Sequence, residues 1–154
     1  MAALAVNKTM ELPQNFTGYD SKKLSYQSFR DFCFSLQSYG VLRVIETFDY
    51  EYPKNYFSAS VEDKDGKFFI LQNCFVPIAT FATKQNEGFV FISKPKVKSV
   101  ADSQNSKNQL LSPVVLNENI QNNHLKLLGH YEQKAVQSWL PVTVGGVLFT
   151  WFFD

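Results

Sequence analysis

Apolar positions in the first third of the chain follow two different periods. Residues 24–39 carry a stripe at i, i+3, i+4 and i+7, which predicts a helix over this range. Ser25 is placed to cap the start of this helix, and Gly40 to follow its end. From residue 41 apolar and polar residues alternate, so we expect a long strand over 41–52 that Pro53 stops. The helical stripe consists of Phe29, Phe32, Cys33 and Leu36.

The next segments predict an antiparallel meander. Residues 56–62 and 67–75 flank Asp63-Lys64-Asp65-Gly66, where Gly66 can adopt the left-handed backbone angles of a tight hairpin turn. The run Phe68-Phe69-Ile70-Leu71 is apolar on both faces, which is typical of a central strand covered above and below. Two further short strands are expected over 78–83 and 88–93.

The second half of the chain is less regular. Residues 94–112 hold lysines among small polar residues, which predicts a mobile polar loop that is either a solvated connection or a partner-contacting segment. Strands are expected over 113–116 and 124–131, with a polar turn over 117–123 between them and helical turns over 132–139.

The C-terminal apolar stripe favours a helix that begins after Thr143 as N-cap. Gly145 and Gly146 together cost about 2 kcal/mol of helix propensity, and the β-branched and aromatic residues of this segment would also suit a strand. The segment therefore keeps two interpretations, of which the helix is favoured. Its stripe consists of Val144, Val147, Leu148, Trp151 and Phe152.

Together these elements predict an α+β fold. We expect an antiparallel sheet of about four to six strands with an N-terminal helix and a C-terminal amphipathic helix packed on it. Residues 1–154 are expected to form a single domain, with residues 1–23 as an arm or loop pinned by Leu12 and Phe16.

Composition excludes several classes of protein. Fifteen Lys and Arg against fourteen Asp and Glu give a formal charge of +1, so no overall field favours nucleic acid or an anionic membrane. No apolar stretch reaches the roughly 20 residues needed to span a bilayer, and no secretory signal is recognised, so a cytoplasmic location is expected. Cys33 and Cys74 are expected to be reduced core thiols.

Catalytic and cofactor motifs are not found. His124 and His130 would stand about 20 Å apart on a strand, too far to share a metal, and each is expected to be a lone surface or half-buried histidine. Gly88-Phe89-Val90-Phe91 resembles part of an RNA-binding aromatic strand, but core packing is favoured at this net charge. The glycines Gly145 and Gly146 are expected to allow close packing. We therefore expect no enzyme activity, no metal and no cofactor.

One acidic and aromatic segment is a candidate for binding another protein. On a strand, Asp49 and Glu51 would lie on one face and the neighbouring aromatics on the other, with more carboxylates of the predicted hairpin nearby. Tyrosines are enriched in binding hot spots, and carboxylates pair with basic partners. The alternative is a solvated strand edge protected by charge. The predicted partner-binding residues are Asp49, Tyr50, Glu51 and Tyr52.

The C-terminal tail carries a family resemblance. It consists of Tyr131, the segment Trp139-Leu140-Pro141-Val142-Thr143-Val144-Gly145, Phe149, Trp151 and Asp154. This ending resembles the C-termini of small bacterial proteins, several of which look like immunity partners of toxins; Gly146 departs from their usual acidic residue. The resemblance implies a protein that neutralises a cognate toxin by occlusion. The alternatives are a small enzyme or ligand-binding domain with an aromatic-lined pocket, and a phage or virion structural subunit.

The terminal stripe gives a first test. We expect Trp151→Ala to lower the free energy of unfolding by about 3–5 kcal/mol, because a large ring on the apolar stripe would pack into the core. Urea denaturation measures this change. A near-neutral result would mean that the tail does not dock on the rest of the protein.

Overall fold

The computed structural model describes residues 11–14, 16–17, 22–51, 54–86, 88–104, 107–138 and 142–149. Five strands form an antiparallel meander in the order β1-β2-β3-β4-β5, and a short β6 pairs parallel with the start of β4. The strands are β1 Arg43–Phe48, β2 Tyr56–Asp63, β3 Gly66–Asn73, β4 Ile78–Gln85, β5 Gly88–Ile92 and β6 Gln109–Leu110. The predicted α+β fold is confirmed.

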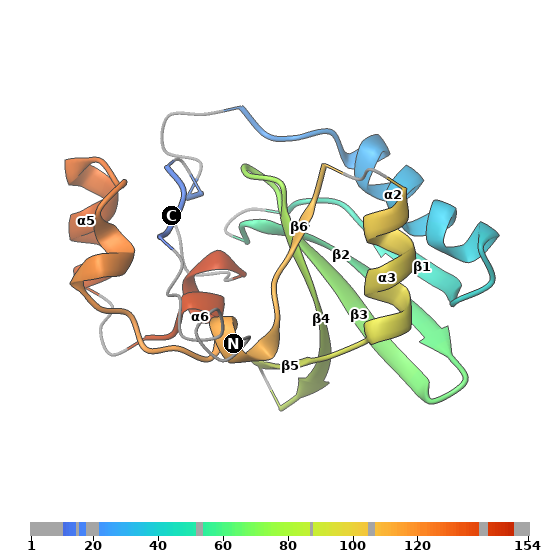
Figure 1. The fold of residues 1–154 in the computed structure, drawn as a ribbon. Helices are drawn as coiled ribbons and strands as arrows, with labels where there is room; N and C mark the ends of the chain where they lie inside the picture. The colour runs from blue at the N-terminus through green and yellow to red at the C-terminus, as the bar shows by residue number, and fades with distance from the viewer. Residues whose placement is uncertain are drawn as a thin grey trace.

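Helices cover the two faces of this sheet. Figure 1 shows α3 across the sheet with α2 beside it, whereas α5 and α6 lie at the other end of the molecule. Among the described helices, none has the length and apolar character to cross a membrane. The helices are α2 Tyr26–Ser38, α3 Pro95–Ser103, α4 Pro113–Leu116, the 3-10 helix η1 Asn122–Leu125, α5 His130–Gln137 and α6 Val144–Leu148.

The N-terminal helix forms where its stripe predicts it. The side chain of Ser25 accepts a hydrogen bond from Ser28 N at 3.1 Å, and Gly40 follows the helix with a φ of +79°. The residues of the stripe are buried against β2, β3 and β4. This cluster, with Phe57, Val61 and Ile70 on the strands, forms one half of the core.

The central strand β3 separates the two halves of the core. Phe68 and Ile70 point to the side of α2, whereas Leu71 joins the opposite cluster with residues of α4, α5 and α6. Gly66 pairs with Asp63 at the hairpin turn and has a φ of +128°, an angle that side chains rarely allow. The predictions of a hairpin and of a central strand are confirmed, as are the two strands that follow. Cover on both faces extends from Ile70 to Asn73, whereas Phe69 is only half-buried.

Three predictions of secondary structure are wrong. The strand β1 ends at Phe48 rather than at residue 52. Residues 113–116 and 124–131 are not strands: α4 starts with Pro113 in its first turn, and η1 starts at Asn122 and is followed by α5. Short apolar runs such as Pro113–Leu116 cannot be assigned by alternation alone, because four residues fit either period. The helical turns expected over 132–139 correspond to α5.

The loop predicted over 94–112 is also wrong, since most of it forms α3 and β6. Val97 and Ala101 are one turn apart and buried against the α2 side of the sheet. The exposed side of α3 carries the ion pair between Lys98 and Asp102 at 2.8 Å. Small buried residues and a lysine-rich outer side give this helix the composition of a loop.

The C-terminal helix α6 starts at the predicted cap. The side chain of Thr143 accepts a hydrogen bond from Gly146 N at 3.0 Å. A Cβ atom on Gly145 would lie 2.3 Å from the ring of Phe91, so the expected close packing is confirmed at this position. The helix ends at Leu148, and Trp151 and Phe152 of the predicted stripe lie outside the described residues, as do Trp139 and Pro141 of the tail motif.

The buried side chain of Asn73 ties the N-terminal arm to this helix. Its Nδ2 donates to Phe16 O at 3.1 Å and to Leu148 O at 2.8 Å. Its Oδ1 accepts from Phe75 N at 2.8 Å and from Val76 N at 3.0 Å. Leu12 and Phe16 are fully buried, so the arm is pinned as predicted. A second buried amide, Asn55, donates to Val147 O at 3.0 Å.

We therefore expect Asn73→Asp to lower the free energy of unfolding by about 3 kcal/mol. The new oxygen would face two carbonyl oxygens in a fully buried site, although the two accepted hydrogen bonds could remain. Urea denaturation at neutral pH measures the loss. The matched control is Asn117→Asp, an exposed position where we expect a change within about 0.5 kcal/mol. Equal stability of the two variants would contradict the role of Asn73.

Candidate functional site

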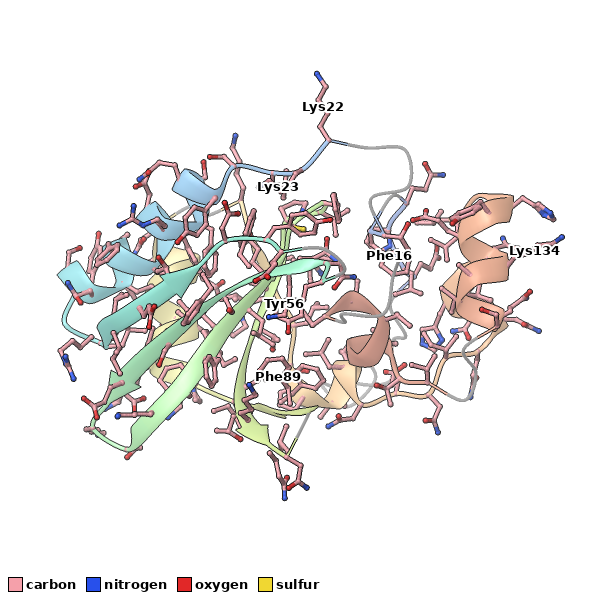
Figure 2. The ribbon with its side chains drawn as sticks, turned by 180° about the vertical axis from the view of Figure 1, so that it is seen from behind. Phe16, Lys22, Lys23, Tyr56, Phe89 and Lys134 are labelled. Atoms are coloured by element: carbon pink, nitrogen blue, oxygen red, sulfur yellow. The ribbon has the colours of Figure 1, made fainter. Side chains whose placement is uncertain are left out.

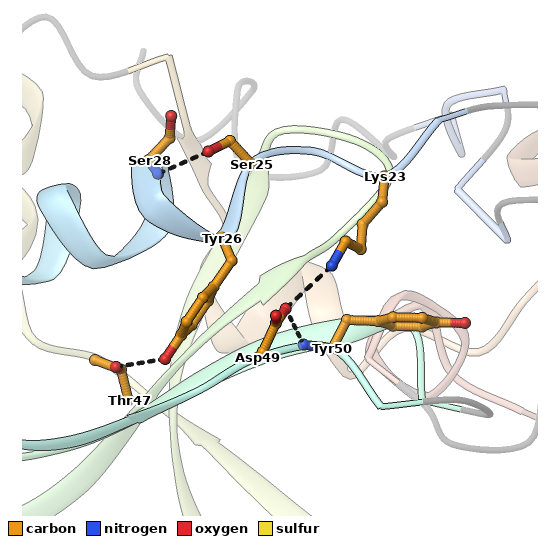
Figure 3. A network of polar contacts seen from close by, with 7 residues as sticks. All are labelled: Lys23, Ser25, Tyr26, Ser28, Thr47, Asp49 and Tyr50. Atoms are coloured by element: carbon orange, nitrogen blue, oxygen red, sulfur yellow. Dashed lines mark hydrogen bonds and ion pairs between the residues drawn. The ribbon is translucent and has the colours of Figure 1, made fainter.

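The predicted binding segment lies at the end of β1 and is held by residues that precede α2. Asp49 Oδ1 accepts hydrogen bonds from Tyr50 N at 2.6 Å and from Lys23 Nζ at 3.2 Å (Figure 3). In the same network, Tyr26 OH and Thr47 Oγ1 are 2.7 Å apart, which fixes the start of α2 to β1. The segment is thus held in place although it is not a strand.

Tyr50 presents one side of its ring to this network. Its ring packs edge-on against Phe75 with centroids 5.8 Å apart, and Lys23 Nζ lies 5.5 Å from its centroid. Glu51 is exposed, and its backbone oxygen accepts from Lys54 N at 2.9 Å. The fourth predicted residue, Tyr52, lies outside the described residues.

The charge of this site differs from the prediction. Because β1 ends at Phe48, the expected separation of carboxylates and aromatics onto two strand faces does not occur. Lys23 pairs with Asp49, and the exposed Lys54 follows Glu51 closely in the chain, so the surface has mixed charge. The hairpin carboxylates are at the far end of the sheet: Glu62 is opposite Arg43, whereas Phe48 is opposite Ser58, about 13 Å away along β2.

Among the described residues, the sheet face opposite α2 is only partly covered. Along β2, Phe57, Ala59 and Val61 are buried against the α2 side. On the opposite side Tyr56 is buried, whereas Ser58 and Ser60 are only half-buried. In Figure 2, α6 lies toward one end of the sheet, and β1–β3 extend beyond it. Phe48 is 41% exposed. We call this uncovered area the open face; its central residues are Phe48, Ser58, Ser60 and Phe69.

The backbone edge of β1 is less accessible than this face. The pairing with β2 shifts register at Ile45, and Val44 N donates to Gln37 Oε1 at 2.7 Å. Arg43 and Glu46 are charged and exposed. Bulges and charges of this kind discourage the addition of another strand. The β1 edge is therefore poorly suited to pairing with a strand of another protein.

The histidines and cysteines have structural surroundings. His124 is 1% exposed, so the prediction of a surface or half-buried residue is wrong for it; Nδ1 accepts from Gln121 N at 2.8 Å and Nε2 lies 3.1 Å from Glu118 Oε2. His130 is exposed. Burial raises the pKa of Cys33 and of Cys74 to about 12, so both free thiols stay protonated at neutral pH. The prediction of core thiols is confirmed.

The aromatic strand β5 packs into the core as predicted. Phe89 contacts the rings of Tyr56 and Phe69, and Phe91 contacts Phe149. No group of three or more His, Cys, Asp or Glu side chains in the described ranges is placed to hold a metal ion.

A second surface was missed by sequence analysis. A groove of about 290 Å³ lies between the tip of the β2–β3 hairpin and the start of α3. We call it the lysine groove. The sequence did not predict this groove, because the segment with Lys94 and Lys96, which forms the wall opposite the hairpin tip, was expected to be a loop. The groove is lined by Lys64, Asp65, Lys94, Pro95, Lys96 and Val97.

Comparison with models of protein families, with curated protein sequences and with solved structures finds no match for this chain.

The ion pair below the lysine groove makes a testable contribution to stability. Burial raises the pKa of Asp63, but hydrogen bonds from Lys94 Nζ and from the N–H groups of Asp65 and Gly66 outweigh it, so the pKa lies below its ordinary value of 3.8. Because the pKa is lower in the folded state, the ionised carboxylate stabilises the fold above about pH 4. This contribution is lost as the pH falls through the folded-state pKa.

We expect Asp63→Asn to lower the free energy of unfolding by about 1 kcal/mol at neutral pH and by progressively less as acidification protonates Asp63 of the unchanged protein. Urea denaturation at neutral and at acidic pH checks this. The control is Asp102→Asn, which removes the exposed pair with Lys98 and should cost no more than about 0.5 kcal/mol. A difference that grows on acidification would contradict the assignment.

Proposed function

We propose that this chain is a protein-binding module whose partner covers the open face and the adjoining segment 49–51. The observation that carries the proposal is the unequal cover of the sheet: β1 and β2 are covered by α2 on one side, whereas Phe48 and the two serines remain accessible on the other. An uncovered aromatic beside small side chains suits a flat or convex partner surface.

The size of this area indicates how far the partner must extend. Three strands at about 4.8 Å spacing and six residues at about 3.3 Å give roughly 300 Å². A stable interface buries about 800 Å² on each partner. The partner must therefore also reach the segment that contains Asp49, Tyr50 and Glu51, together with the lysines beside it.

The mixed charge of that segment favours a particular mode of recognition. Phe48 and the ring of Tyr50 would supply buried contact area, and Glu51 and Lys54 would form rim contacts that set orientation more than affinity. A strongly basic partner is not required, because Lys23 already neutralises Asp49.

More concretely, we propose an immunity protein that neutralises a cognate bacterial toxin by occlusion. Support comes from the resemblance of the tail and from a binding surface that needs no chemistry of its own. A cytoplasmic location belongs to the same proposal, and the two free, buried thiols fit a reducing compartment.

The test compares substitutions to glutamate at exposed positions on two different surfaces. A tagged chain is purified from the native host at high salt, and the proteins bound to it are identified and quantified by mass spectrometry. We expect one stoichiometric partner with the unchanged protein and with Val114→Glu, a control position that is 64% exposed on α4. We expect at least tenfold less of it, about 1.4 kcal/mol, with Phe48→Glu.

Glu51→Lys tests the adjoining segment without breaking the Lys23–Asp49 pair, and it should also weaken capture. Each variant must retain the melting temperature of the unchanged protein. The proposal is rejected if no stoichiometric partner appears, or if Phe48→Glu and Glu51→Lys both bind as well as Val114→Glu. If the captured protein is a toxin, inhibition by an equimolar amount of this chain tests the immunity assignment.

A further inference from the structure

The side chain of Lys94, in the wall of the lysine groove, is held in place by its neighbours. Its ammonium group lies 2.9 Å from Asp63 Oδ2 and 4.6 Å from the ring centroid of Phe68, and its side chain is only 15% exposed. Within the described part of the chain, the bond to Asp63 is the one hydrogen bond that Lys94 Nζ makes, and Asp65 Oδ2 is 4.0 Å away. An ammonium group has three donors, so Lys94 can still donate into the groove.

Two further lysines line the groove. Lys64 comes from the hairpin tip and Lys96 from the first turn of α3, and neither forms an ion pair with another described residue. The three lysines outnumber the two carboxylates of Asp63 and Asp65, which leaves an excess of one positive charge at the groove. The remaining lining, Pro95 and Val97, is apolar.

We propose that the lysine groove binds the phosphate group of a small molecule. Lys94 would donate from the wall of the groove, while Lys64 and Lys96 would close over the anion from its two sides. The apolar lining would contact the body of the ligand. This inference does not depend on the protein-binding function, because the groove is at the hairpin tip, at the opposite end of β1 from segment 49–51.

The donor set favours phosphate over a carboxylate. The carboxylate of Asp63 already occupies one donor of Lys94, and three cations from two segments can approach several anionic oxygens at once. A phosphate group carries about −1.5 to −2 charges at neutral pH and three acceptor oxygens. Lysine is a common phosphate ligand that acts as a point charge. A volume of about 290 Å³ limits the ligand to a small molecule.

The test is a titration with inorganic phosphate at low ionic strength, followed by amide nitrogen–proton correlation spectra of the full chain. We expect saturable shifts at residues 64–66 and at Val97. Lys64→Gln combined with Lys96→Gln should weaken this binding at least tenfold. The matched control, Lys126→Gln combined with Lys134→Gln, removes the same charge from exposed positions elsewhere and should change the affinity less than twofold. Lys94 is left unchanged because it holds Asp63.

Three results would overturn the proposal. Shifts that do not saturate, or that are spread over many residues, would indicate an adventitious ion only. Saturable shifts that survive in the Lys64 and Lys96 double variant would place the anion elsewhere. Acetate, titrated in parallel at matched ionic strength, should bind at least tenfold more weakly; equal binding would show that the groove selects charge alone and would refute the assignment to phosphate.

Discussion

The amide of Asn73 joins segments that are far apart in the chain, and the C-terminal half of the fold depends on it. Its two donors hold Phe16 O of the arm and Leu148 O at the end of α6, and its oxygen fixes the turn that follows β3. An aspartate side chain could only accept hydrogen bonds, and a leucine side chain could neither donate nor accept them, so this site requires an amide. A helix of five residues that contains Gly145 and Gly146 has little intrinsic stability. The buried amides and the contact of Gly145 with Phe91 keep α6 in place.

The positions of α4 and α6 determine which part of the sheet they leave exposed. The helices α4 and α6 cover the sheet where Leu71, Ile78 and Ala82 face them, and they do not extend over β1 and the middle of β2. The other face is covered by α2 and α3. The open face is therefore what remains when a short, tightly held C-terminal segment covers a longer sheet. The serines of β2 suit this half-exposed position, since they need neither full burial nor full hydration.

Although the net charge is near neutral, the charged side chains are paired at particular places on the surface. Lysines from segments distant in sequence come to lie beside carboxylates: Lys23 beside Asp49, and Lys94 beside Asp63. Each pairing changes the character of a surface. The first turns a segment that is acidic in sequence into one of mixed charge, and the second holds an ammonium group at the wall of a groove. Neither could be predicted from spacing, because an ion pair across 26 or 31 residues leaves no local pattern.

Local signals in the sequence are sufficient to predict α2, the hairpin of β2 and β3, the strands β4 and β5, and the capped start of α6. In these segments, local periodicity, turn residues and burial agree. Long-range packing, by contrast, is responsible for the end of β1 at Phe48, for the helical state of the lysine-rich segment α3, and for the burial of His124. Short segments fit more than one period, and what fixes them is packing against distant parts of the chain. The two proposed binding surfaces belong to this second group: Asp49, Tyr50 and Glu51 could be identified in the sequence, but the residues that surround them could not.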